Sequence, residues 1–222
     1  MRESYSENVC EITWMDVAPL EDPGLFSRWL GRMPETRREN IISLGAADIR
    51  RMSLGVGILL VLALEKRGIE GSGVNIAEGK YGQPWLPDHP NLHFSLSHGG
   101  NRALCAICGC PVGCDVESFG RGNRRLVGRF FHPEEQEALG RETDPEAWDR
   151  LFTRIWTRKE SYLKATGRGL SLPMSSFSVL SPEPGVRYED RLLPGKQSAS
   201  CCVFSGERVV FDWKAADVFR KG

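Results

Sequence analysis

The sequence predicts an α+β fold built from two halves of similar content. Two stretches, residues 25–66 and 121–167, place apolar side chains mostly at helical spacing. Short segments of alternating or continuous apolar character, bounded by glycine and proline, surround these stretches and are typical of strands. Each half of the 222-residue chain therefore holds one long helical stretch and several short strands. This arrangement would suit two similar subdomains packed face to face.

The composition is that of an ordinary globular protein. Hydrophobic residues make up 41% of the chain and charged residues 26%, and the formal net charge is zero. Because overall charge would not attract nucleic acid or anionic lipid, any anion site has to be local, and we expect neither as a partner. The longest apolar stretch, residues 58–64, is too short to span a bilayer, and the N-terminus lacks the apolar core of a signal peptide. We expect a cytoplasmic protein.

The first half is predicted to contain a strand at residues 11–14 and helices at residues 25–30 and 35–66. The apolar face of the last stretch consists of Ile41, Ile42, Leu44, Ile49, Met52 and Leu59. The opposite side is basic, with Arg37, Arg38, Arg50 and Arg51. From the residues alone, a solvated helix face explains these arginines better than a binding site.

The middle of the chain is predicted to form a turn-rich loop or hairpin followed by strands. Residues 78–90 are rich in glycine and proline, which leaves little room for regular structure. Residues 92–110 indicate two strands joined at a Gly-Gly-Asn turn, and a third strand follows Pro111. In the second half, Pro133 with two following glutamates is typical of a helix start, and residues 175–213 indicate short strands split by turns.

Four of the seven cysteines lie within residues 105–114. Disulfide pairing in so short a stretch is sterically awkward, so we expect reduced thiols. Cys105 and Cys108 form a C-x-x-C pair that admits a zinc site, but no second pair of ligands at a matching spacing is evident. Small hydrophobic side chains in a buried strand are the more economical explanation.

Asp115 and Glu117 are two residues apart in a predicted strand, so both carboxylates project from the same face. Two like charges at this distance repel each other unless a cation lies between them. Mg²⁺ is commonly held by one or two carboxylates together with substrate phosphate oxygens, which makes this pair a candidate metal site. An exposed strand face, or pairing with Arg124 and Arg125, remains the alternative.

Residues 151–165 form a strongly amphipathic helix with Glu160 and Lys164 one turn apart. The simplest explanation of these two residues is a surface ion pair. Glu160 also lies at the edge of the apolar face, four residues after Trp156, from where its carboxylate could reach inward as a third metal ligand. In the segment F-S-L-S-H-G-G, His98 precedes two glycines at a turn where a histidine can meet an anion, although most turn histidines are satisfied surface groups.

In this order the motifs resemble those of the phosphopantetheinyl transferases of the surfactin-synthetase-activating (Sfp-like) type. The matching segments are Y-G-Q-P, F-S-L-S-H-G-G, V-G-C-D-V-E, R-F-F-H-P-E-E and W-T-R-K-E-S-Y-L-K-A-T-G-R-G-L-S-L-P. The resemblance extends roughly from Tyr81 to Phe177, nearly half of the chain. The segment around Arg50, Arg51 and Gly55 is similar to the R-x-L-L-G segment of the family.

The resemblance implies a monomeric pseudo-dimer with subdomains 1–111 and 112–222. Each would be a small, mainly antiparallel sheet with a long helix, and coenzyme A would bind in the cleft between them. The implied reaction moves the 4'-phosphopantetheine arm of coenzyme A to a serine of an apo acyl or peptidyl carrier protein and releases adenosine 3',5'-bisphosphate. In that reaction Mg²⁺ and a lysine stabilise charge on the pyrophosphate.

The resemblance also implies roles for individual residues. The implied Mg²⁺ ligands are Asp115, Glu117 and Glu160. The implied catalytic residues are Asp115, Glu160 and Lys164, and either Glu160 or a water on the metal would take the serine proton. The implied contacts with coenzyme A come from Arg38, Arg51, Lys80, Gln83, Ser97, His98, Lys159 and Lys164.

One position departs from the family pattern. Gln83 stands where many members have lysine, which removes a cation expected near the nucleotide phosphates, and Lys80 is a substitute three residues earlier. Two other functions remain open from sequence: a coenzyme A-binding protein without transfer activity, and another Mg²⁺-dependent phosphohydrolase such as a nuclease. Three carboxylates beside a lysine argue against the first, and the absence of an evident basic stripe argues against a nuclease.

Overall fold

The structure is a computed structural model that describes residues 9–219, the side chain of Leu170 excepted. These residues form a mixed α+β fold. Its helices are α1 (Pro23–Leu30), α2 (Glu35–Ser43), α3 (Ala47–Glu65), α4 (Arg124–Phe130), α5 (Pro133–Arg141) and α6 (Pro145–Thr166). Its strands are β1 (Val9–Asp16), β2 (Ala77–Glu78), β3 (Pro84–Trp85), β4 (His93–Gly99), β5 (Arg102–Cys108), β6 (Val112–Ser118), β7 (Val186–Leu193), β8 (Gln197–Phe204) and β9 (Val210–Ala215). Within this range no helix is both long and apolar enough to cross a membrane.

The strands form two main sheets and a small hairpin. The first sheet has the order β4-β5-β1-β9, the second has the order β6-β8-β7, and β2 pairs with β3. All neighbours are antiparallel except β1 and β9, which run parallel. Strand β9 comes from the end of the chain yet completes the first sheet, so it crosses the expected division at residue 111. That division stays a prediction.

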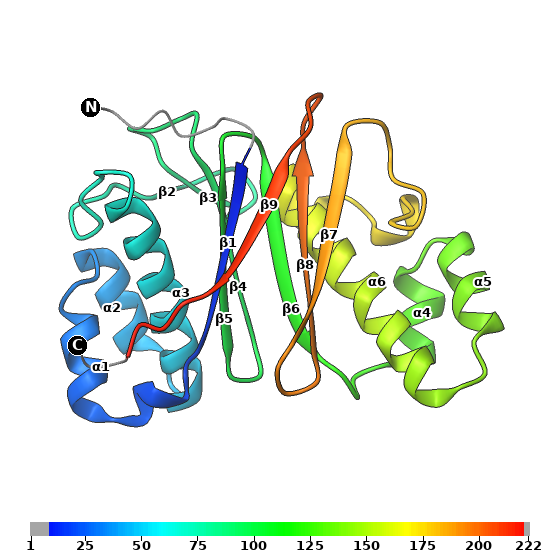
Figure 1. Cartoon of the computed structure of the whole chain (residues 1–222), viewed down its shortest axis with the longest axis horizontal. Coiled ribbons are helices and arrows are strands. Elements are labelled where there is room, and N and C mark those ends of the chain that lie inside the picture. Colours follow the sequence, from blue (N-terminus) through cyan, green and yellow to red (C-terminus); the bar gives the residue numbers. More distant parts are fainter. Residues whose placement is uncertain (1–8, 220–222) are drawn as a thin grey trace.

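Helices cover the outer faces of the two sheets, and the sheets meet in the middle (Figure 1). Helix α3 packs on the first sheet around a core that includes Ile58 and Ile107. Helix α6 packs on the second sheet around a core that includes Ile155 and Val179. A third core lies between the sheets and consists of strand residues such as Ile12, Leu104, Val116 and Val203.

The two long helical stretches are broken more often than the apolar spacing predicts. Residues 35–66 are two helices rather than one, because Leu44 and Ala46 adopt extended backbone conformations on either side of Gly45. Ile42 and Ile49, expected on the buried face, are 57% and 42% exposed on either side of this break. The second stretch divides into α4, α5 and α6.

Helix starts in the second half follow local sequence rules. At α5, His132 and Glu135 form a reciprocal capping box just before and after Pro133. At α6, the Asp144 carboxylate accepts a hydrogen bond from the Ala147 backbone N–H, and Pro145 occupies the first turn. The helix ends at Gly167, whose positive φ of 63° is a conformation that glycine tolerates best.

Two glycines bring the backbone of β6 into direct contact with its neighbours. A Cβ added at Gly113 would lie 1.9 Å from the Ser161 carbonyl oxygen of α6. A Cβ added at Gly99 of β4 would lie 2.2 Å from the Val116 carbonyl oxygen of β6. Both glycines therefore allow an approach that any side chain would prevent. As a result β6 is held closely between α6 on one side and β4 on the other.

We predict that Gly113→Ala destabilises the protein by about 1–3 kcal/mol or more, because the new methyl group would have to push α6 away from β6. The matched control is Gly128→Ala in α4, where nothing lies within 4 Å of the added Cβ. That change should be neutral or should stabilise by about 0.4–1 kcal/mol. Denaturant unfolding of both variants provides the measurement. Equal free energies of unfolding would contradict the close packing described for Gly113.

Candidate active site

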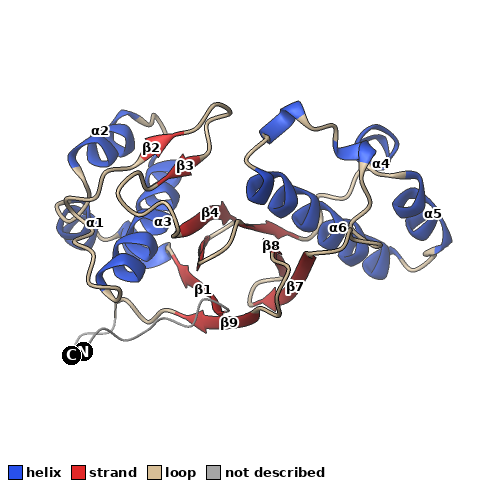
Figure 2. Ribbon diagram, turned by 90° about the horizontal axis from the view of Figure 1, so that it is seen from above, coloured by secondary structure: helices blue, strands red, loops and turns tan. Residues whose placement is uncertain are grey.

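A cleft of about 270 Å³ lies between the β2–β3 hairpin, strand β4 and helix α6. Figure 2 shows that the hairpin and α6 lie on the same side of the sheets. The cleft is thus built from residues on both sides of position 111. Its lining residues are Tyr81, Gly82, Gln83, Pro84, Phe94, Ser95, Leu96, Glu160, Leu163, Lys164, Gly167 and Gly169.

A partly buried ion pair lies beside this cleft and joins three elements. The Lys164 ammonium of α6 donates hydrogen bonds to Asp115 Oδ1 of β6 at 2.8 Å and to Ser97 Oγ of β4 at 2.9 Å. It also donates to the Cys114 carbonyl oxygen at 3.0 Å. The Ser97 hydroxyl in turn donates to Asp115 Oδ1 at 2.7 Å. These contacts fix the carboxylate and the ammonium relative to both halves.

The ion pair also sets the charge state of the lysine. Burial by itself would lower the pKa of Lys164, but the Asp115 carboxylate opposes it and the net effect is a raised pKa. Lys164 therefore stays protonated. The surface ion pair with Glu160 that the sequence allows is replaced by a contact with a carboxylate 49 residues away in the chain.

Glu117 and Glu160 both have raised pKa values, and the two glutamates share two causes. Burial is the larger cause in both, and the charge on Asp115 adds to it. The Glu117 carboxylate contributes further to the shift of Glu160. Glu117 is partly compensated by Arg121, whose guanidinium lies 3.0 Å from it. The three carboxylates thus repel one another, which is the electrostatic signature of a site that favours a cation.

The residues present fit Mg²⁺ by the kind of ligand they offer. Asp115 Oδ2 is buried and has no hydrogen-bond partner among the described residues, so one oxygen is left without a compensating contact. All three side chains offer carboxylate oxygens, the ligands that Mg²⁺ prefers. Within residues 9–219, however, no three such side chains are already arranged around a common point where a metal could lie. The ligand set Asp115, Glu117 and Glu160 therefore stays a prediction.

Besides Lys164, which lines the cleft, three predicted coenzyme A contacts belong to the cleft wall or to its surroundings. Gln83 lines it, and its amide donates to the Lys164 carbonyl oxygen at 2.9 Å, so this side chain packs on the end of α6. Ser97 lies in the ion-pair cluster described above. The pKa of His98 is lowered by partial burial and by the positive charges of Lys164 and Arg37. This histidine therefore lies in a positive environment.

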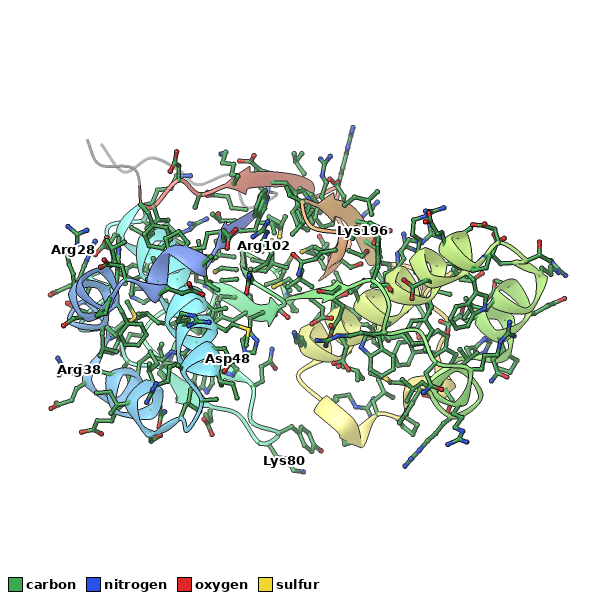
Figure 3. The ribbon with its side chains drawn as sticks, turned by 90° about the horizontal axis from the view of Figure 1, so that it is seen from below. Arg28, Arg38, Asp48, Lys80, Arg102 and Lys196 are labelled. Atoms are coloured by element: carbon green, nitrogen blue, oxygen red, sulfur yellow. The ribbon has the colours of Figure 1, made fainter. Side chains whose placement is uncertain are left out.

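The other predicted basic contacts lie farther out. Figure 3 shows Arg38 on the outer side of α2 and Lys80 at the tip of the β2–β3 loop, where its side chain points outward. The Lys80 ammonium is 5.2 Å from the centre of the Tyr81 ring. Arg51 lies 3.5 Å from Glu21. None of these three cations is among the residues that line the cleft. Their contacts with coenzyme A stay predictions.

Lys159 does not fit the phosphate-binding role that the motif suggests. Its side chain is fully buried and forms an ion pair with the equally buried Glu135 at 2.8 Å. It also donates hydrogen bonds to the carbonyl oxygens of Met174 and Phe177 at 2.7 and 2.8 Å. An ammonium with three such partners has little left to offer a ligand in the cleft. Lys159 therefore connects α6 to α5 and to the loop after α6, and we remove it from the candidate site.

Sequence reasoning missed several residues that shape the cleft. Phe94 and Leu163 supply apolar wall, and Gly167 leaves room against Gln83, whose side-chain oxygen would lie 1.9 Å from a Cβ added there. Tyr81 and Gly167 fall inside the Y-G-Q-P and T-G-R-G-L segments, so the motifs contained a signal for them. Arg37, which the sequence places on a solvated helix face, is instead partly buried, and its guanidinium donates to the Ser53 carbonyl oxygen at 2.9 Å.

Strand β6 and helix α6, which carry the acidic cluster, lie in a part of the chain that is similar to a known class of transferase. Residues 111–215 match the family model of the 4'-phosphopantetheinyl transferase superfamily.

Similar curated proteins include 4'-phosphopantetheinyl transferases of several bacteria. The chain is 33% identical to 4'-phosphopantetheinyl transferase Sfp of Bacillus subtilis over 138 residues, which cover 62% of this chain and 61% of that relative. It is 38% identical to 4'-phosphopantetheinyl transferase HetI of Nostoc over 128 residues, covering 55% and 54% of the two proteins. The match to the gsp protein of Aneurinibacillus migulanus is longer, at 28% identity over 170 residues and 70% of that relative. The chain thus matches about three fifths of the length of the first two B. subtilis relatives.

We predict that Lys159→Met destabilises the protein by about 3–5 kcal/mol, because it leaves the buried Glu135 carboxylate without its cation. The double variant Lys159→Met/Glu135→Gln should recover part of this loss, since it removes the unpaired charge and keeps an amide oxygen that can accept from the Val179 backbone N–H. Denaturant unfolding compares the two variants. A single variant as stable as the parent protein would show that Lys159 has no structural role.

Proposed function

We propose that this protein transfers the 4'-phosphopantetheine arm of coenzyme A to a serine hydroxyl of an apo carrier protein. The observation that carries the proposal is the cluster of Asp115, Lys164 and Ser97 beside a cleft that Glu160 lines. The match of residues 111–215 to the family model of the 4'-phosphopantetheinyl transferase superfamily supports it. The products would be the holo carrier and adenosine 3',5'-bisphosphate.

The chain's own residues would bind, orient and move a proton. Lys164 is kept protonated by Asp115 and lines the cleft, so it would attract the pyrophosphate and stabilise the charge that develops on its oxygens. Glu160 lies one helical turn before Lys164 on the same wall and would accept the proton of the attacking serine. Ser97 and Gln83 would hold Lys164 in position, the first through its ammonium and the second through its carbonyl oxygen.

Asp115, Glu117 and Glu160 would hold Mg²⁺ in this reaction. When bound, the ion would supply positive charge that neutralises the pyrophosphate oxygens and would relieve the repulsion among the three carboxylates. The unpartnered Asp115 Oδ2 supports this assignment, since it is an anionic oxygen with no other compensating contact among the described residues.

The two-layered arrangement also supports the expected pseudo-dimer. In each half one long helix, α3 or α6, covers the outer face of a sheet, and the sheets pack on each other through a shared core. We propose that the halves are similar subdomains, 1–111 and 112–222, and that the second contributes β9 to the sheet of the first. One chain would then form the complete site. The carrier protein and coenzyme A would then meet in the cleft of a monomer.

The direct test of the function is a carrier modification assay. The protein is incubated with coenzyme A, Mg²⁺ and several apo carrier proteins of acyl and peptidyl type, and each carrier is weighed by mass spectrometry. The proposal expects a mass gain of one phosphopantetheine arm on the carrier serine. Binding of coenzyme A without a mass gain on any carrier would instead support a binding protein, and hydrolysis of phosphate esters without transfer would support a phosphohydrolase.

We predict that Asp115→Asn reduces the transfer rate at least about a hundredfold, because it removes a charge that both holds Lys164 and would ligate the metal. The matched control is Asp212→Asn on β9, where the carboxylate is exposed and pairs with Lys214. The control should keep the parent rate. Circular dichroism and denaturant unfolding establish that both variants are folded. A folded Asp115→Asn protein with unchanged turnover would exclude Asp115 from the site.

We predict that Gln83→Lys lowers the dissociation constant of coenzyme A by about two- to fivefold, the effect of one added solvent-accessible ion pair with phosphate. The new ammonium can still donate to the Lys164 carbonyl oxygen that Gln83 contacts. Calorimetric titration with coenzyme A measures the change, and raised salt should reduce it. Equal affinities of the two proteins would show that position 83 does not face a phosphate.

A further inference from the structure

Four cysteine thiols meet where the chain crosses from the first sheet to the second. Cys10 of β1, Cys108 at the end of β5 and Cys201 of β8 are at most 1% exposed and belong to the core between the sheets. Cys110 lies in the bend between β5 and β6, is partly exposed and packs against the same core. None of the seven cysteines forms a disulfide in the structure.

The Cys108 and Cys110 sulfurs are close enough to react with each other. Residues 109 and 110 form a bend that turns the two side chains together, and the sulfur atoms are 3.3 Å apart. A single residue, Gly109, separates the two cysteines. The sequence suggested that pairing among these cysteines is awkward, but this pair needs only a small movement to close a bond.

The two thiols of this pair have different chemical surroundings. Hydrogen bonds from the thiols of Cys10 and Cys110, and from the backbone N–H groups of Cys110 and Gly109, lower the pKa of Cys108. The neighbouring Cys108 sulfur raises the pKa of Cys110. Cys108 therefore loses its proton more readily than Cys110. This difference favours the Cys108 sulfur as the nucleophile of the second step, once Cys110 has reacted.

We propose that Cys108 and Cys110 form a redox modification site that reacts with low-molecular-weight disulfides and closes an intramolecular disulfide. Cys110 is the entry point, because it is the only cysteine of the four with part of its surface open to solvent. Cys108 is the resolving residue, because it lies next to Cys110 and is inaccessible to a reagent.

The reaction proceeds by two exchanges and balances without any further reagent. The Cys110 sulfur, after its proton passes to solvent, attacks one sulfur of the reagent disulfide, so a mixed disulfide forms and one reagent thiolate leaves. The Cys108 sulfur then attacks the Cys110 sulfur and expels the second reagent thiolate. The two leaving thiolates take up the two protons that the cysteines lose. Two protein thiols are oxidised, and one reagent disulfide is reduced to two thiols.

Cys10 and Cys201 form a second close pair of thiols, and they serve as an internal control. If every close pair of cysteines were oxidised, this pair would form a disulfide as well. Their sulfurs are 3.7 Å apart and would link β1 of one sheet to β8 of the other. Both side chains are 0% exposed, so a reagent cannot reach either sulfur while the fold is intact. We expect this pair to stay reduced under native conditions.

The experiment treats the folded protein with hydroxyethyl disulfide, alkylates the remaining thiols under denaturing conditions and determines intact and peptide masses. The wild-type protein should lose two of its seven alkylatable thiols together, and fragmentation should locate the disulfide at Cys108 and Cys110. Dithiothreitol should restore all seven thiols. A stable mixed disulfide on wild-type Cys110, a disulfide between Cys10 and Cys201, or seven free thiols after treatment would each overturn the proposal.

Variants assign the order of the two steps. Cys108→Ser should accumulate a stable mixed disulfide on Cys110, because the resolving sulfur is gone. Cys110→Ser should react at least about tenfold more slowly than wild type, because the entry point is gone. The control Cys105→Ser removes a cysteine of the same strand that is 1% exposed and belongs to the α3 core, and it should form the disulfide as wild type does. Oxidation of folded Cys110→Ser at the wild-type rate would also contradict the proposal.

Discussion

A buried carboxylate has to be compensated by a cation or by hydrogen bonds. Asp115 is such a carboxylate, and the arrangement of the elements around it depends on this compensation. Its partners come from elements that are distant in the chain: Ser97 lies on β4 of the first sheet and Lys164 lies on α6. Satisfying one carboxylate thus ties the first sheet, the second sheet and the long helix together beside the cleft. The cost of leaving Asp115 unpaired, about 3–5 kcal/mol for a broken buried pair, is a large share of the stability of a typical domain.

Close backbone packing makes this compensation geometrically feasible. Gly113 lets α6 lie directly on β6, and Gly99 lets β4 approach β6 from the other side. Asp115 follows Gly113 by two residues on the same strand and so faces the region where both neighbours are nearest. On α6, Lys164 reaches the carboxylate while Glu160, one turn earlier, lines the cleft. The same packing that stabilises the fold therefore sets the positions of the groups to which we assign the chemistry.

The parts of the site that local pattern could predict are those carried by one element. Alternation in residues 112–117 indicated a strand with Asp115 and Glu117 on one face, and helical spacing indicated that Glu160 and Lys164 share a helix; both elements are confirmed. Pairings between elements could not be predicted, because periodicity says nothing about which distant residue a side chain meets. Lys164 was expected beside Glu160 but contacts Asp115, and Lys159 was assigned to phosphate but is enclosed with Glu135. The break at residues 44–46 was missed because Ile42 and Ile49 continue the apolar spacing although both are exposed.

We propose that the acidic cluster around Asp115 holds a metal ion that acts on coenzyme A in the adjacent cleft. The most direct measurement is a crystal structure of the protein grown with coenzyme A and Mn²⁺, an ion that takes the same oxygen ligands as Mg²⁺ and can be located by its anomalous signal. We expect an anomalous peak in contact with Asp115, Glu117 and Glu160 and with the pyrophosphate of coenzyme A in the cleft. Coenzyme A bound in the cleft with no metal at these carboxylates, and with Lys164 still the sole cation on Asp115, would contradict it.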